Sequence, residues 1–322
     1  MRGGRWWIPG AVLVLLLSLT LGVMIGPAGS WGTASWNIVW KVRMPRIVLA
    51  GIVGAMLSLA GASYQGVFRN PLVDPYLLGV AAGAGLGATI VFAVGRTTTT
   101  GWLVDPLPLA AFVGGLVAVF LTYLVGASFG ASSSRNGVTL VLAGVAVTSL
   151  ATAIQAFVLQ RNSEVVREVY SWILGRLTTA TWSDVRLVLP YVIVSSVVLL
   201  LHRRHLDVLR VGDDEAAALG THVQRVRLSV VIAATMGTAA VVSVSGLIGF
   251  VGIVVPHLVR MLAGASYRRV LPLSLLVGAA FLILADIPGR VLQDPAETPI
   301  GVVTAFLGAP FFIVVMRTRR VS

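Results

Sequence analysis

Long apolar runs separated by short polar segments dominate the chain. A run of about 20 apolar residues can cross a bilayer as a helix, because a helix hydrogen-bonds every backbone amide internally. We therefore expect residues 1–322 to form a single all-α membrane domain with about ten transmembrane helices. These helices are predicted over residues 7–27, 46–67, 76–95, 106–126, 137–160, 185–201, 225–244, 253–263, 268–291 and 301–318.

The eighth predicted helix belongs to an unusual stretch. Residues 228–259 carry no charge apart from the partly ionisable His257, but they barely suffice for two crossings, and turn-forming residues interrupt them. The interruptions are Gly246, Gly249, Gly252 and Pro256. Non-helical backbone at membrane depth survives where protein or a water-filled cavity covers it. The pattern favours a broken, partly re-entrant segment beside a pathway over a kinked, fully packed helix.

Composition supports a membrane protein. Hydrophobic residues make up 57% of the chain and charged residues 11%, compared with roughly 25% charged in a soluble domain. A soluble enzyme or a disordered chain is excluded. No cysteine is present, so a disulfide framework or a cysteine-based metal site is also excluded.

The basic residues indicate partners and orientation. The net charge is +12, but these residues fall between apolar runs, which favours membrane lipid headgroups over nucleic acid. Placing both termini in the cytoplasm puts 15 of the 24 basic residues on that side, as the positive-inside rule prefers. The alternative is that the first apolar run is a signal peptide with Arg2 and Arg5 before it.

Any ATP-driven work by this protein needs another subunit. The chain contains one lysine, Lys41, and it follows Trp40 where a Walker A loop requires glycine. We expect no cofactor in this chain, with ATP and Mg²⁺ held by a partner ATPase.

The longest polar stretch is suited to docking such a partner. Within residues 202–227, Gly212 precedes three acidic residues and an alanine-rich turn that ends at Gly220, which predicts a short helix. We assign residues 207–222 as a cytoplasmic loop that contacts the ATPase. A solvated loop helix without such a role is the alternative.

Five ordered segments between about residues 40 and 318 resemble the FecCD family, the permeases of ABC importers for iron siderophores, haem and cobalamin. The segments are Arg43-Met-Pro-Arg46; Gly54 to Leu72 with Asp74-Pro and Leu78-Gly-Val; Gly212 to Gly220; Gly246 to His257; and Ala285 to Arg290 with Glu297 to Thr304 and Gly308-Ala-Pro310. The resemblance implies a type II ABC importer permease fold in the bacterial cytoplasmic (inner) membrane. It also implies a second permease subunit, favouring a homodimer, two ATP-binding cassette subunits and an extracytoplasmic binding protein.

The same resemblance implies roles for particular residues. Arg43 and Arg290 would dock the binding protein through salt bridges, with Lys41 and Arg46 as supporting charges or lipid contacts. Asn70 and Leu72 would form the cytoplasmic gate, where two copies meet across the dimer axis. The coupling helix would contain Asp213, Asp214, Glu215, Leu219 and Gly220.

Other polar residues inside the predicted helices are candidates for the transport pathway or for an ion pair. Thr148, Thr152, Gln155 and Thr304 could line the transport pathway, although hydroxyl groups also bond within and between helices. Asp286 is the one carboxylate predicted within a span, and Arg290 four residues later is its expected ion-pair partner.

The favoured function is import of an iron chelate, either a siderophore or haem, by alternating access. A cobalamin permease is the alternative within the family, and an ion-coupled secondary transporter is the alternative outside it. An intramembrane hydrolase is disfavoured, because no G-x-S-x-G motif occurs and the other three histidines lie in the polar loop.

Overall fold

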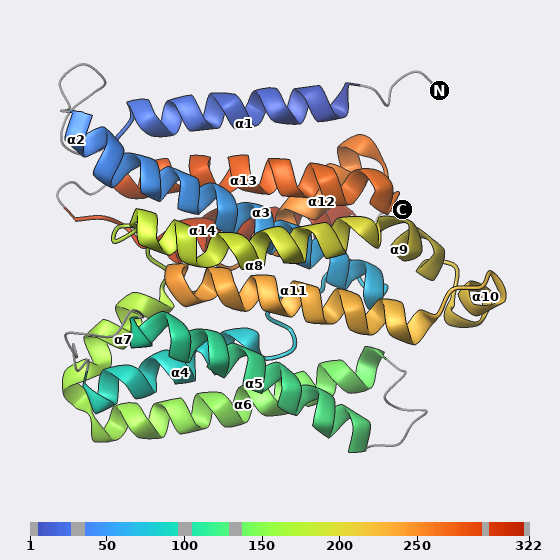
Figure 1. Ribbon diagram of the computed structural model, residues 1–322, viewed down its shortest axis with the longest axis horizontal. Coiled ribbons are helices and arrows are strands. Elements are labelled where there is room, and N and C mark those ends of the chain that lie inside the picture. Colours follow the sequence, from blue (N-terminus) through green and yellow to red (C-terminus); the bar gives the residue numbers. More distant parts are fainter. Residues whose placement is uncertain (1–5, 27–35, 96–104, 129–136, 292–295, 319–322) are drawn as a thin grey trace.

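The computed structural model describes residues 6–26, 36–95, 105–128, 137–291 and 296–318 (Figure 1). Every regular element in these ranges is a helix. The long helices are α1 (Trp7–Met24), α3 (Met44–Val67), α4 (Val80–Val94), α5 (Pro106–Ser128), α6 (Gly137–Arg161), α8 (Trp182–Leu201), α11 (Val223–Ser245), α12 (Val251–Ala263), α13 (Tyr267–Val291) and α14 (Ile300–Thr318). The short ones are α2 (Trp36–Ile38), the π-helical η1 (Val39–Arg43), the 3₁₀ turn η2 (Ser163–Val165), α7 (Val166–Ile173), α9 (Arg203–Leu209) and α10 (Asp213–Ala218).

The all-α prediction is confirmed, and each of the ten predicted segments coincides with one long helix. Within the described residues, seven helical segments are long and apolar enough to cross a membrane, and α2, η1 and α3 together form one of them. The helices α4, α12 and α14 are shorter apolar helices. Ten complete crossings therefore stay a prediction.

Helix α3 occupies the centre of the larger helix group, which also contains α1, α8, α11, α12, α13 and α14 (Figure 1). Most of its side chains are buried against α13, α11, α12 and α8. Its contact with α13 depends on glycine, because a Cβ atom on Gly54 would lie 2.2 Å from the carbonyl oxygen of Gly278. Small residues let transmembrane backbones approach closely and gain van der Waals contact.

Helices α4, α5, α6 and α7 form a second group beside α11 (Figure 1). Here α4 and α5 meet through another glycine pair. A Cβ atom on Gly83 would lie 2.2 Å from the carbonyl oxygen of Gly114. The many glycines of the sequence thus serve helix packing at more than one interface.

The predicted break in the stretch from residue 228 to 259 is confirmed at Gly246 and Gly249, whereas Gly252 and Pro256 lie inside α12 and do not interrupt it. Helix α11 ends at Ser245, residues 246–250 are non-helical, and α12 begins at Val251. The Tyr76 hydroxyl donates a hydrogen bond to the Ile248 carbonyl (3.0 Å) and accepts one from the Ile248 amide (3.1 Å). A side chain from the α3–α4 connection therefore satisfies backbone groups that a continuous helix would have bonded itself.

The two ends of the bundle differ. Helix α1 begins and α14 ends at the end that also carries α9 and α10 (Figure 1). We call this the loop end, because residues 207–222 lie there, and we call the other the opposite end. The chain is an integral membrane protein, and the cytoplasmic placement of the loop end stays a prediction.

Candidate functional site

A buried charge cluster lies at the opposite end, where α3 begins and α13 ends. We define it as Arg46, Asp286, Arg290 and Glu297. Arg46 binds both carboxylate oxygens of Asp286, at 2.9 and 2.8 Å, and its Nη1 reaches Glu297 at 2.7 Å. Arg290 donates to Asp286 from Nε at 2.6 Å and also from Nη2. The expected ion pair between Asp286 and Arg290 is confirmed.

Two arginines hold the end of α1 in place. Arg43 donates to the carbonyl oxygens of Val23 (3.1 Å) and Gly26 (3.3 Å), and Arg290 donates to that of Gly22 (3.1 Å). The last carbonyls of a helix lack intrahelical partners, and positive charge near them is favourable. The two guanidinium groups therefore cap the C-terminus of α1.

This geometry corrects the expectation that Arg43 and Arg290 present their charges to a binding protein. The two residues are only 3% and 2% exposed. In this conformation they are covered by α1 and by the charge cluster, so a salt bridge to a docked protein would first require them to leave these partners. Docking at these side chains is a prediction that their burial does not support.

Arg46 is the residue whose importance the sequence did not reveal. We expected a supporting charge or a lipid contact, but its side chain lies between two carboxylates from distant parts of the chain. The sequence feature that could have indicated this role is the presence of two acidic residues, Asp286 and Glu297, in the same C-terminal segment as Arg290.

At the loop end, residues 207–222 are fixed to three long helices. The Asp207 carboxylate accepts hydrogen bonds from the Ser266 hydroxyl and the Tyr267 amide, both at 2.7 Å, and so caps the start of α13. The Asp213 carboxylate, at the start of α10, lies 3.1 Å from Arg227 of α11 and 3.1 Å from Arg69 at the end of α3. Movement of this loop would therefore be transmitted to α3, α11 and α13.

The predicted gate residues directly follow Arg69. Arg69 has a positive backbone φ of 50°, and the Asn70 side-chain oxygen accepts the Leu72 amide at 2.9 Å, which makes a tight turn. Asn70 and Leu72 are exposed at the loop end. The structure thus brings the predicted gate and the predicted coupling helix together through the Arg69–Asp213 ion pair.

The remaining coupling residues present an open surface. Asp214, Glu215, Leu219 and Gly220 are exposed, and the Leu219 residue is 69% exposed. Gly220 adopts a φ of 80° with open space around its Cα, which makes it the left-handed residue that follows the helix end. An exposed leucine beside exposed carboxylates is suited to contact with another protein.

An apolar concavity borders the helix break. It has a volume of about 650 Å³ and lies between the break, the end of α7 and one face of α14. Its lining includes Leu174, Leu247, Phe250, Ala305 and Phe306. Phe250 adopts a left-handed backbone with a φ of 68° at the start of α12. The expectation that the broken segment adjoins an open space is consistent with this concavity.

The predicted pathway residues fall into two pairs. Thr152 is exposed on α6 and Thr148 is half-buried. Gln155 instead points into the subunit and donates to the Thr89 hydroxyl at 2.9 Å, and Thr304 is buried and bonds to the Gly301 carbonyl at 3.1 Å. Their burial argues against the expectation that Gln155 and Thr304 line a pathway between subunits.

No group of three histidine, aspartate or glutamate side chains is arranged to hold a metal ion within the part of the chain that the structure describes. The charge cluster balances two arginines with two carboxylates, so its chemistry is that of a structural ion-pair network.

Comparison with known proteins agrees with these features. Residues 10–318 match the FecCD transport family. The chain is 41% identical to the cobalamin import system permease protein BtuC of Halobacterium salinarum, over 88% of this chain and 74% of that protein. It is 35% identical to the hemin transport system permease protein HmuU of Yersinia pestis, over 96% of this chain and 95% of that protein.

A solved structure shows the same fold. It is described as an inward-facing conformation of a metal-chelate type ABC transporter, and it matches with a TM-score of 0.86 and 31% identity. The match covers 97% of this chain and 98% of the other. The chain therefore belongs to the FecCD transport family and is a permease subunit of an ABC importer.

Proposed function

We propose that the chain imports an iron chelate, a ferric siderophore or haem, which an extracytoplasmic binding protein delivers. Cobalamin is the alternative substrate, since relatives of the chain carry either haem or cobalamin in their names. The substrate passes through without chemical change. Two copies of the chain pair around the pathway, and two ATPase subunits that hold ATP and Mg²⁺ bind at the loop end.

The attachment of α10 to the long helices is the observation that supports ATP-driven transport by this chain. A lever transmits force only if it is fixed to what it moves, and Asp213 ties α10 to both α3 and α11 while Asp207 ties the loop to α13. The exposed Leu219 and the exposed carboxylates of Asp214 and Glu215 remain accessible to the ATPase. An ATPase that closes around ATP would thus shift three long helices together.

The position of the turn after α3 supports the gate assignment. Because Arg69 pairs with Asp213 at 3.1 Å, a shift of α10 is passed directly to Asn70 and Leu72. In the dimer these two residues from each copy would close the pathway toward the cytoplasm. ATP binding would change the separation between the gate residues of the two copies. The pathway would then open alternately to the outside and to the cytoplasm.

The apolar concavity supports a weakly binding pathway. A bulky chelate must not adhere to the walls, and the concavity beside the helix break is lined by small and apolar residues. Exposed Thr152 on α6 supplies a hydroxyl group without a charge. Ion-coupled secondary transport, which usually needs intramembrane carboxylates, fits less well because Asp286 is neutralised by two arginines.

Reconstitution tests the proposal. The chain, its ATPase and its binding protein are incorporated into liposomes, and ATP-dependent uptake of ferric siderophores, haem and cobalamin is compared. Leu219→Gln should reduce ATPase binding and uptake. Leu201→Gln is the matched control, because Leu201 is equally exposed, at 69%, and ends α8 at the same end. Uptake of cobalamin alone would replace the proposed substrate, and failure to bind any ATPase would refute the coupling assignment.

A further inference from the structure

The connection between α3 and α4 forms a stiff turn, and we call residues 69–76 the gate turn because they contain the proposed gate residues. Within it the Val73 amide donates to the Asn70 carbonyl at 3.3 Å, and one Asp74 carboxylate oxygen accepts the Tyr76 amide at 2.8 Å. Side chains that bond the backbone two residues on stabilise such turns. The start and the end of the gate turn are therefore held in one unit.

The end of the gate turn lies directly against the helix break. The Tyr76 hydroxyl donates to the Ile248 carbonyl at 3.0 Å and accepts from the Ile248 amide at 3.1 Å. Beside it, a Cβ atom on Gly252 would lie 2.4 Å from Cδ of Pro75, so the proline ring packs on the backbone of the first turn of α12. The break cannot move away from the gate turn without losing these contacts.

Gln65 makes a second attachment between the same two segments. Its Nε2 donates to the Val73 carbonyl at 3.2 Å and to the Gly252 carbonyl at 3.0 Å. The Gly252 carbonyl benefits from a donor outside α12, because Pro256 four residues later has no amide hydrogen. Gln65 is buried, and its Oε1 accepts a hydrogen bond from Arg260 at 2.5 Å. The Gln65 amide is thus bonded at both its nitrogen and its oxygen.

The helix break in turn forms part of the wall of the apolar concavity. Leu247 and Phe250 of the break line this space together with Ala305 of α14. A Cβ atom on Gly308 would lie 2.3 Å from Cβ of Phe250, so Phe250 lies against the backbone of α14. A displacement of the break therefore moves Phe250 relative to α14 and changes the shape of the concavity.

We infer that the gate turn and the helix break move as one element, and that Tyr76 and Gln65 are the positioning residues that join them. The inference rests on the proposed function, in which a shift of α10 reaches the gate turn through Arg69. The same shift then reaches the wall of the concavity through Tyr76 and Gln65. The gate and the wall consequently respond to ATP together, because separating them breaks buried hydrogen bonds.

Thiol labelling at two positions tests this inference. The chain contains no cysteine, so a single introduced thiol reports on a single position. Leu72→Cys reports on the gate, and Ala305→Cys reports on the wall of the concavity. The complex with its ATPase is reacted with N-ethylmaleimide in proteoliposomes, without nucleotide and with a non-hydrolysable ATP analogue, and the mass of the chain gives each labelling rate. We expect the analogue to change both rates by about fivefold or more, as for a typical coupling between two sites.

Tyr76→Phe separates the two responses. It removes the hydroxyl group that bonds Ile248, so the response at Ala305→Cys should fall about fivefold, which corresponds to one net hydrogen bond. The response at Leu72→Cys should persist, because the ion pair between Arg69 and Asp213 is intact. A full response at Ala305→Cys in the Tyr76→Phe chain overturns the inference.

Tyr64→Phe is the matched control. Its hydroxyl group forms a buried hydrogen bond with Thr235 at 2.7 Å, which joins α3 to α11. Both helices are tied to α10 through Asp213, so this bond is not on the route from the gate turn to the break. Both reporters should keep their response in Tyr64→Phe, and an equal loss in the two tyrosine variants overturns the inference. If Leu72→Cys does not respond in the otherwise unmodified chain, the proposed function itself is refuted.

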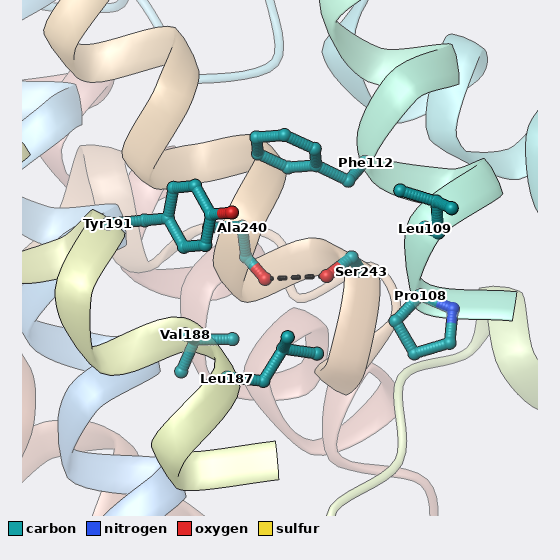
Figure 2. A pocket seen from close by; sticks show the side chains of 8 residues that line it. All are labelled: Pro108, Leu109, Phe112, Leu187, Val188, Tyr191, Ala240 and Ser243. Atoms are coloured by element: carbon teal, nitrogen blue, oxygen red, sulfur yellow. Dashed lines mark hydrogen bonds between the residues drawn. The ribbon is translucent and has the colours of Figure 1, made fainter. Parts of the chain in front are cut away.

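A third reporter detects general loosening of the helices. Ser243 lies on α11 two residues before its end, but it faces a separate apolar pocket between α5 and α8 (Figure 2). Its hydroxyl group donates to the Ala240 carbonyl at 2.8 Å, and its side chain is buried. Ser243→Cys should be labelled slowly and at the same rate with or without Tyr76→Phe. Faster labelling in the Tyr76→Phe chain would show a purely structural role for Tyr76 and overturn the inference.

Discussion

Replacing Asp286 by asparagine removes the negative charge that lies between the guanidinium groups of Arg46 and Arg290. The substitution keeps the shape of the side chain but changes the net charge of the cluster from zero to +1. All three side chains are almost fully buried, with exposures of 9%, 2% and 1% for Arg46, Asp286 and Arg290. Removing one partner from a buried ion pair costs about 3–5 kcal/mol.

The contacts that remain set the expected value within that range. Arg46 keeps Glu297 at 2.7 Å, and Arg290 keeps the carbonyl of Gly22 at 3.1 Å, so neither cation is left without a partner. We therefore expect Asp286→Asn to lower the free energy of unfolding by about 3 kcal/mol. Glu297→Gln is the comparison, because this side chain is 24% exposed and its ion pair in the described part of the chain is with Arg46; it should cost about 1 kcal/mol.

The assay is unfolding of the purified chain in mixed micelles by a denaturing detergent, followed by tryptophan fluorescence and circular dichroism. An Asp286→Asn variant that unfolds within about 1 kcal/mol of the unmodified chain would contradict this expectation, since a buried charge would then have lost its main partner at little cost. Equal destabilisation by Glu297→Gln would contradict it as well, because exposure would then not distinguish the two carboxylates.

Two further substitutions test packing and coupling. Gly54→Ala should destabilise the chain by about 1–3 kcal/mol, because the new Cβ atom would lie 2.2 Å from the Gly278 carbonyl oxygen. Gly51→Ala is the control and should be tolerated, because its Cβ atom would meet its first neighbour at 3.4 Å. Equal melting temperatures for the two variants in detergent would contradict this prediction. Arg69→Gln removes the ion pair to Asp213 and should reduce substrate uptake per ATP hydrolysed, with stability changed by less than about 1 kcal/mol because the pair is partly exposed. An unchanged ratio of uptake to hydrolysis in proteoliposomes would show that this pair does not transmit the movement.

Several features followed from the sequence because local physics determines them. Apolar run length predicted every long helix, since a segment in the bilayer must bond its own backbone. Gly246 and Gly249 predicted the break before α12, and the four-residue spacing of Asp286 and Arg290 predicted their ion pair.

The direction in which each side chain points was not available from the sequence. Membrane helices are apolar on the face toward lipid and on the face toward protein, so hydropathy does not distinguish the two faces as it does in a soluble helix. For this reason Gln155 and Thr304 were expected at a pathway and were found inside the subunit.

The partners of the arginines also depended on the tertiary structure. Arg43, Arg46 and Arg290 looked like exposed charges at helix ends. Nothing in the sequence indicated that the C-terminus of α1 would lie beside Arg43 and Arg290. The sequence by itself determined the helices, the break and the family, because these depend on neighbouring residues and ordered motifs. Only the tertiary structure decided that Arg46 joins Asp286 and Glu297 and that Arg290 reaches the Gly22 carbonyl, because these contacts join residues more than 200 positions apart.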